Sequence, residues 1–237
     1  MTFDDTLALP PAIQREALLT SVSIQKDFVD WRKGRQRYAV WVVDVDTASL
    51  RAVAHRLHDA LDDCLFPEYR RQPHITLRIG GFPAAERGFD DDYTAADFSR
   101  HLDALIQARI QPFHITLGPP QTFPSAPYLS VTDPTRGLTR LRQSFPGIEP
   151  GGADFRFVPH VTLGLYCRRV PVAQVIARMA ACAGLLPIPL EVRRIALMTY
   201  EASTISGPLH SVCAFDLAER RLQVLDDEAM RPLLGAS

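Results

Sequence analysis

Residues 73–77 read PHITL, and residues 159–163 read PHVTL. One short pattern therefore occurs twice, each time with a proline before the histidine and a leucine after the threonine. In a β-strand, side chains two positions apart point to the same face, so the histidine and threonine of each copy lie together. The apolar residues on either side of the threonine face the opposite way, where helices can cover them. The repeat predicts a duplicated unit in which each half contributes one such strand.

The two polar pairs are His74 with Thr76 and His160 with Thr162, and both suit acid–base chemistry on a phosphodiester. A neutral imidazole can take a proton from a nucleophile while a protonated one gives a proton to a leaving oxygen. The two hydroxyls can hold the non-bridging oxygens of a phosphate. One HxT pattern is typical of many solvated strands. Two copies with matching flanks favour a metal-free phosphodiester site.

The rest of the chain alternates between strand and helix patterns. Residues 38–45 and 155–166 read as strands that contain buried positions, and the Ala-rich residues 172–186 read as a helix. Residues 190–201 form a single strand pattern near the end. The predicted order is β-α-β-α-β-β-α-β-α-β-β, in which neighbouring strands break a purely parallel pattern. This order favours two-layer sheets with helices on one face.

Composition limits the classes of protein that remain possible. The chain has 237 residues, of which 46% are hydrophobic, enough for one large domain or two lobes with a core. A formal net charge of −1 argues against a strongly basic surface that follows long nucleic acids. The four cysteines show no CxxC spacing, and no apolar run approaches the roughly 20 residues of a membrane span. The acidic, proline-broken start is not a signal peptide, so we expect a soluble, cytoplasmic monomer.

With these two motifs the sequence resembles the two-histidine (2H) phosphoesterase superfamily, and within it the bacterial RNA 2',5'-ligase and cyclic phosphodiesterase branch. Members carry one H-x-T/S motif followed by an apolar residue in each lobe. The likeness extends to residues 38–43 (YAVWVV), 113–123 (FHITLGPPQTF) and 195–217, which resemble the first strand, the central hairpin and the closing strands of the family. It covers roughly residues 37–218.

The resemblance implies an α+β fold of two lobes related by a pseudo-twofold axis. Two mainly antiparallel sheets would line a central cleft, with helices outside. Residues 1–36 would be an N-terminal extension, residues 37–218 the bilobal domain, and residues 219–237 a C-terminal tail. The catalytic residues would be those of the two HxT motifs.

Further substrate contacts are less determined by the sequence. Arg78 and Arg156 share the faces of the two motif histidines by strand parity, and either could clamp a phosphate or lie on the surface. A third motif-like stretch, residues 113–117 (FHITL), falls on the central hairpin, where a solvated strand face is the alternative to ligand contact. The remaining candidates for substrate contact, each with a packing role as its alternative, are His114, Tyr166, Tyr200 and His210, with Phe82 and Phe123 as further aromatic residues on which a base could stack.

The resemblance implies a metal-independent phosphodiesterase that acts on RNA ends or small nucleotides. The expected reaction is hydrolysis of a 2',3'-cyclic phosphate, with reversible 2',5' RNA ligation as a second reaction of the same site and no cofactor. Both limbs of the pH–rate profile would lie near histidine values of roughly 6–7. The alternatives are a metal-dependent hydrolase, although no HxH or HExxH spacing is present, and a binding module of the same fold with weak catalysis.

Overall fold

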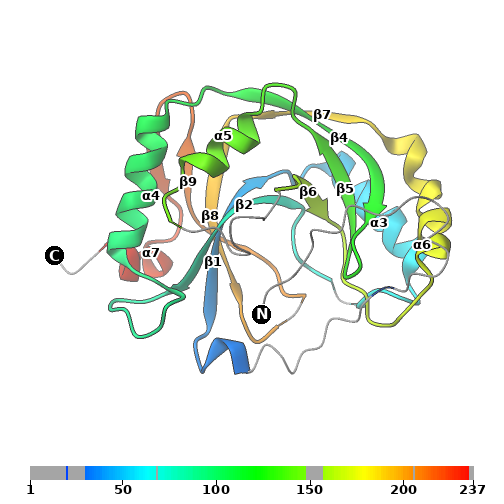
Figure 1. The fold of residues 1–237 in the computed structure, drawn as a ribbon, viewed down its shortest axis with the longest axis horizontal. Coiled ribbons are helices and arrows are strands. Elements are labelled where there is room, and N and C mark those ends of the chain that lie inside the picture. The colour runs from blue at the N-terminus through cyan, green and yellow to red at the C-terminus, as the bar shows by residue number, and fades with distance from the viewer. Residues whose placement is uncertain (1–19, 21–29, 68, 148–156, 205, 235–237) are drawn as a thin grey trace.

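The structure is a computed structural model that describes residues 20, 30–67, 69–147, 157–204 and 206–234 (Figure 1). The first elements are β1 (Arg37–Asp44), α3 (Ala48–Leu61), β2 (His74–Pro83), β3 (Asp92–Tyr93) and α4 (Ala95–Ala108). The middle elements are β4 (Phe113–Thr122), β5 (Pro127–Thr132), α5 (Gly137–Ser144), β6 (His160–Thr162), α6 (Val172–Met179) and the 3-10 helix η1 (Ala180–Leu185). The last are β7 (Ile188–Val192), β8 (Arg194–Glu201), β9 (His210–Asp216), β10 (Arg221–Val224) and α7 (Asp227–Leu234).

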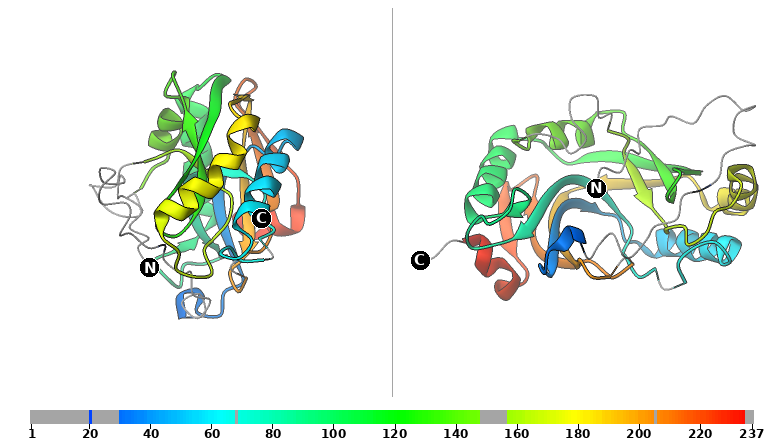
Figure 2. Two further views of the ribbon diagram at one scale, coloured as in Figure 1. Left: turned by 90° about the vertical axis from the view of Figure 1, so that its right-hand side faces the viewer. Right: turned by 60° about the horizontal axis from the view of Figure 1, so that its bottom comes forward.

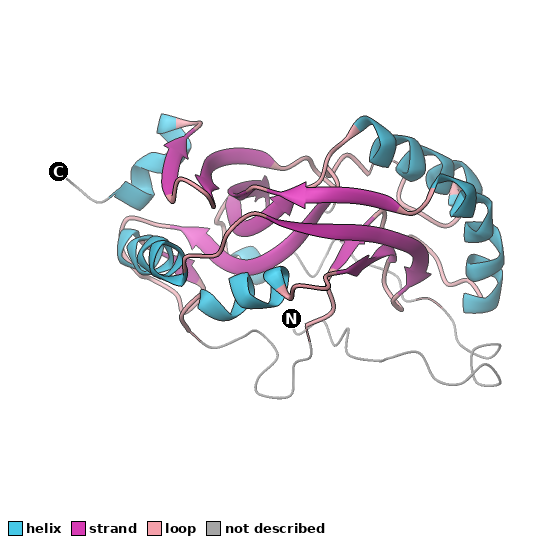
Figure 3. Ribbon diagram, turned by 90° about the horizontal axis from the view of Figure 1, so that it is seen from above, coloured by secondary structure: helices cyan, strands magenta, loops and turns pink. Residues whose placement is uncertain are grey.

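The strands form two sheets. The larger has the order β10-β9-β8-β1-β2-β3, and the smaller has the order β6-β5-β4-β7. Neighbouring strands are antiparallel except for the short parallel pair of β2 and β3. Figure 2 shows the strands of the larger sheet curving strongly, and Figure 3 shows helices at the outer ends of the strand layers. The expected two-lobed α+β fold with antiparallel-rich sheets is confirmed.

Several element boundaries differ from the sequence prediction. The single strand expected over residues 190–201 is two strands, because the chain leaves the smaller sheet after β7 and enters the larger sheet as β8. The helix expected over 172–186 tightens into η1 after Met179. Strand β10 and helix α7 were not predicted. Among the described residues, no helix has the length and apolar character that crossing a bilayer requires.

Helix α3 shows how local sequence and packing agree. Thr47 caps its start, because the threonine hydroxyl accepts a hydrogen bond from the Leu50 N–H at 3.2 Å. Leu50, Val53, Leu57 and Leu61 are all fully buried, as their helical spacing predicts. The helix therefore packs one apolar face into the main core and leaves its polar residues toward solvent.

Strand β1 separates two apolar clusters. Ala39, Trp41 and Val43 belong to the main core, which the helices cover, whereas Val40 and Val42 belong to a smaller cluster on the opposite face. This alternation follows the two-residue period of a strand. We call the face of the larger sheet that carries Val40 and Val42 the inner face, and the face that carries Trp41 the helix face.

A β-bulge interrupts the pairing of β2 with β1. Thr76 lies opposite Val42, whereas Arg78 lies opposite Trp41, so Leu77 is the extra residue. The Leu77 carbonyl accepts a hydrogen bond from Nη1 of Arg142 on α5 at 2.8 Å. Because the bulge adds one residue, it reverses the side-chain parity of β2 at Arg78 and Ile79, until a second register shift before Gly81 restores it.

The two lobes are joined beside the second motif strand. Leu65 and Tyr166 form an antiparallel bridge, and Cys167 N–H donates to the Cys64 carbonyl at 2.9 Å. On α3, Nε2 of His58 lies 2.8 Å from the Leu163 carbonyl. These contacts fix the segment that follows β6 against the end of α3.

Gly81 is a position where the fold requires glycine. Its φ of 120° is one that other residues rarely adopt, and an added Cβ would lie 2.3 Å from the Asp91 carbonyl oxygen. We expect Gly81→Ala to lower the free energy of unfolding by about 2 kcal/mol. For a chain of this size that corresponds to a drop in Tm of roughly 4–8 °C in a thermal melt.

The matched control for this substitution is Gly184→Ala. A Cβ at Gly184 meets no atom within 4 Å, so its Tm should stay close to that of the unmodified protein. Equal melting temperatures for the two variants would show that a side chain added at residue 81 does not strain the backbone.

Candidate active site

The two motif strands lie next to each other although they belong to different sheets. Strands β2 and β6 are in contact (Figure 1). The charge of His160 acts on His74 and contributes to lowering its pKa. Ile75 and Val161, the middle residues of the two motifs, are fully buried, whereas the histidines are half-buried. This alternation follows the expected strand parity, and it turns both imidazoles away from the helix-covered core.

Both histidines are held in the same way. Nδ1 of His74 lies 2.7 Å from the Gln72 carbonyl, and Nδ1 of His160 lies 2.7 Å from the Val158 carbonyl. A carbonyl oxygen only accepts hydrogen bonds, so Nδ1 carries the hydrogen in each ring. The nitrogen that exchanges protons is therefore Nε2 in both cases. The two halves of the duplication share the tautomer as well as the motif.

Gln72 positions the carbonyl that orients His74. Its side-chain amide donates to the Leu209 carbonyl at 3.0 Å and accepts from the Leu209 N–H at 2.7 Å. The Gln72 side chain thus makes the two backbone hydrogen bonds that a neighbouring strand would otherwise make to Leu209, the residue just before β9. Next to it, Arg70 N–H donates to the Ser206 carbonyl at 2.9 Å. The segment before His74 is therefore anchored to the segment before β9.

The surroundings of His74 disfavour its charged form. Burial, together with the positive charges of Arg71 and His160, lowers the pKa of His74 to about 4, against the opposing effect of the Gln72 carbonyl. Asp44 lies opposite His74 in the strand pairing, but its carboxylate accepts the Asp46 N–H at 2.9 Å. His74 is therefore neutral at pH 7, with Nε2 able to accept a proton.

His160 has a different environment. Its ring lies edge-on to Phe123 at 4.8 Å and to Tyr128 at 5.6 Å between ring centroids. Phe123 and Tyr128 stack on each other at 4.0 Å, and the Tyr128 hydroxyl donates to Gln121 at 2.8 Å. These rings fix the plane of the imidazole. Phe123 is buried in this contact, so it supports His160 and offers no open face for a base.

Arg78 does not share the face of the motif residues, and the expectation from strand parity is wrong. The bulge at Leu77 places it on the helix face, opposite Trp41, with 6% of the residue exposed. Its Nη2 donates to the Pro146 carbonyl at 2.9 Å. A role as the phosphate clamp of this site is excluded by that orientation.

Tyr166 is a core residue, so its predicted substrate contact is also wrong. It is 0% exposed, and its hydroxyl lies 2.7 Å from the Thr122 hydroxyl at the junction of the lobes. Phe82 is likewise buried, between Trp31 and Tyr38. Aromatic residues of the lobe junction and of the sheet edge are thus used for packing.

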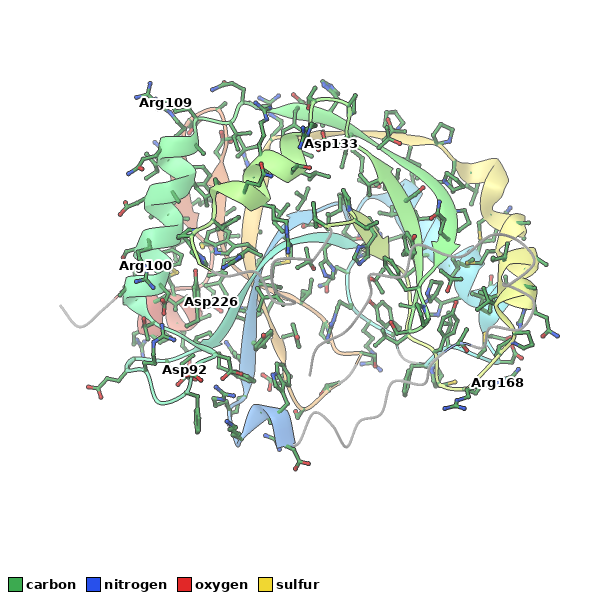
Figure 4. The ribbon with its side chains drawn as sticks, in the orientation of Figure 1. Asp92, Arg100, Arg109, Asp133, Arg168 and Asp226 are labelled. Carbon is green, nitrogen blue, oxygen red and sulfur yellow. The ribbon has the colours of Figure 1, made fainter. Side chains whose placement is uncertain are left out.

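His210 points to the helix face as well, which contradicts its predicted contact with substrate. It pairs with Thr199 across β8, and its Nε2 lies 2.5 Å from Oδ2 of Asp226. Figure 4 shows Asp226 beside α7, on the side of the molecule away from β6. The preceding residue, Leu209, is the one that faces the inner cluster.

The remaining candidates have mixed outcomes. His114 is exposed on β4 opposite Glu191, two strands away from β6, so the structure does not bring it to the motif histidines. Tyr200 lies on the inner face opposite Tyr38, and its contact with substrate stays a prediction. Arg156 lies outside the described residues.

Sequence reasoning missed Arg71, whose charge acts directly on His74. By strand parity, a residue three positions before His74 faces the other way, so the rule discards it. Arg71 precedes β2, however, and a residue outside a strand does not follow that parity. Among the described residues, no three side chains of the metal-ligating types His, Cys, Asp and Glu are grouped as a metal site.

The family comparison covers both motif strands of this site. Residues 67–204 match the 2'-5' RNA ligase superfamily, which is more than half of the chain and includes both HxT motifs. TT0787 of Thermus thermophilus is similar in structure, with a TM-score of 0.52, 17% identity, and coverage of 76% of this chain and 98% of that chain. E. coli LigT complexed with 3'-AMP has a TM-score of 0.47 at 16% identity, covering 76% and 98%. No curated protein matches the sequence.

Two HxT strands brought together from two lobes define a 2H phosphoesterase. The chain belongs to the 2'-5' RNA ligase superfamily. The resemblance stated from the motifs is thereby confirmed. Membership gives the protein a phosphoesterase or RNA-ligase-type activity, while the reaction and the substrate within that class need a separate argument.

The Gln72 clamp can be tested by Gln72→Ala. The variant loses both amide contacts with Leu209, so we expect unfolding free energy to fall by about 1–2 kcal/mol, measured by chemical denaturation. Because the carbonyl that orients His74 becomes less fixed, kcat should fall by about tenfold. Gln107→Ala, at an exposed position on α4, is the control and should change neither quantity. An unchanged kcat in Gln72→Ala would show that the clamp does not position His74.

Proposed function

We propose that the protein is a metal-independent phosphodiesterase that hydrolyses the 2',3'-cyclic phosphate at an RNA end or on a small nucleotide. The observation that carries this proposal is the pair of motif histidines, which lie on two strands in contact and each have Nδ1 bound to a carbonyl. Two imidazoles in one tautomer supply the base and the acid that hydrolysis of a phosphodiester requires.

In this proposal His74 is the general base. Its imidazole is neutral at pH 7, so Nε2 takes a proton from the attacking water as the water oxygen forms a bond to phosphorus. His160 is the general acid, and it gives its Nε2 proton to the ribose oxygen as the bond from phosphorus to that oxygen breaks. The product is a phosphomonoester beside a ribose hydroxyl, and the two histidines have exchanged protonation states.

The threonines complete the site. Thr76 and Thr162 lie on the same faces as their histidines, so their hydroxyls can donate to the non-bridging phosphate oxygens. Charge that develops on those oxygens in the transition state is then stabilised by fixed donors. The same arrangement supports 2',5' ligation, in which a ribose 5'-hydroxyl replaces water as the nucleophile and the bond from phosphorus to the ribose 3'-oxygen breaks as the new linkage forms.

The first test is turnover of a short RNA that ends in a 2',3'-cyclic phosphate, with a chelator present. We expect the unmodified protein to open the ring, and His74→Ala and His160→Ala to lose about 10²–10⁴-fold in kcat/KM. His114→Ala removes an exposed imidazole from a distant strand and should keep full activity.

Two outcomes would contradict the proposal. Loss of activity with chelator that metal restores would favour a metal-dependent hydrolase. Binding of the RNA without turnover, unaffected by either histidine substitution, would favour a binding module of this fold.

The pH dependence separates the two histidines. Because kcat/KM rises as the base loses its proton, the acid limb follows His74 and should lie near pH 4 in place of the 6–7 that an ordinary histidine gives. The alkaline limb follows loss of the proton from His160. An acid limb at pH 6–7 that is unchanged in His74→Ala would contradict the assignment of His74 as base.

A further inference from the structure

Arg71 is fixed by contacts on two sides. Its guanidinium lies over the ring of Tyr200 at 4.1 Å from the centroid, and its Nε donates to the Gly207 carbonyl at 3.3 Å. Its chain neighbours, Arg70 and Gln72, are both hydrogen bonded to the segment before β9. A cation stacked on an aromatic ring and held at both neighbouring residues keeps one orientation.

This arrangement leaves the outer edge of the guanidinium available. Within the described residues Arg71 is half-buried and hydrogen bonds through Nε, so its two terminal amines keep N–H groups for a ligand. The terminal amines form the planar fork that matches two oxygens of a phosphate. Tyr200 lies on the inner face of the larger sheet, the face that also carries the first motif.

The positive charge of Arg71 is directed at His74, which also experiences the charge of His160. Two further basic groups, one from the segment before β2 and one from β6, therefore act on His74. Such a convergence is unfavourable in an empty site and becomes favourable when an anion enters it. Arg78, the arginine that strand parity favoured as the phosphate clamp, cannot take this role, because it lies on the helix face and donates to the Pro146 carbonyl.

We propose that Arg71, oriented by Tyr200 and the Gly207 carbonyl, is the residue that binds the non-bridging oxygens of the substrate phosphate beside His74. This inference rests on the proposed phosphodiesterase function and adds a substrate-binding residue outside both HxT motifs. Arg71 would hold the phosphorus in line for attack and would balance the charge that gathers on the oxygens in the transition state.

The experiment uses the full chain and three variants, Arg71→Gln, Arg71→Lys and Arg221→Gln. Arg221 on the edge strand β10 has 82% of its side chain exposed, so its substitution removes the same charge far from the site. For each protein we would measure kcat and KM with the cyclic-phosphate RNA, the inhibition constant of inorganic phosphate, and the pH–rate profile. A thermal melt confirms that each variant is folded.

For Arg71→Gln we expect kcat/KM to fall at least tenfold and inorganic phosphate to inhibit at least tenfold more weakly. The acid limb should also move to higher pH, because one of the charges that lower the pKa of His74 is gone. A merely structural role would not produce that shift. Arg71→Lys keeps the charge without the planar fork, so it should recover the position of the acid limb but only part of the phosphate affinity. Arg221→Gln should match the unmodified protein.

Tyr200→Leu provides a second variant, because it removes the ring that orients the guanidinium and leaves Arg71 in the chain. We expect weaker phosphate inhibition, with a smaller effect than Arg71→Gln. Unchanged phosphate inhibition and an unchanged acid limb in folded Arg71→Gln would overturn the inference while the cyclic phosphodiesterase activity stands. Absence of turnover in the unmodified protein would instead refute the proposed function on which the inference rests.

Discussion

The register of β2 against β1 is the constraint on which the site depends. As far as Thr76 the strand keeps its alternation, so the first motif presents its histidine and threonine on one face and buries Ile75 on the other. The extra residue at Leu77 then turns the following side chain, Arg78, toward the helices. Since a shift of one residue moves the following side chains to the other face until the next register shift, the bulge separates the catalytic part of β2 from the stretch that carries Arg78.

This division explains how far the sequence could predict the site. The HxT pattern is local, and two-residue parity holds within three residues, so the motif faces could be derived without the structure. Arg78 could not, because a bulge depends on the partner strand and on Arg142, whose side chain donates to Leu77 from α5. The fold followed the same limit. The apolar spacing of Leu50, Val53, Leu57 and Leu61 is enough to predict α3, while the division into β7 and β8 depends on which sheet each half joins.

The duplication makes the two histidines equal in sequence but not in environment. Both rings bind a carbonyl two residues earlier, so their tautomers are the same. His74 is desolvated beside Arg71, whereas His160 lies against the edges of two aromatic rings. A base and an acid must hold different numbers of protons at one pH, and two identical environments would not provide that difference. The asymmetry therefore comes from the residues around the motifs, which the repeat does not specify.

The same asymmetry connects substrate binding to proton transfer. In the empty site, the charges of Arg71 and His160 oppose a proton on His74 and keep that ring a weak base. A bound phosphate brings negative charge to the point where these groups converge, and opposite charge stabilises the protonated form of a histidine. His74 should therefore become a stronger base only when the anion is in place. Because the proton it accepts comes from the nucleophile, the anion being attacked would itself strengthen the base that activates the attack. This coupling requires the cations and the imidazole to share one small volume, which is what the pairing of the segment before β2 with the segment before β9 provides.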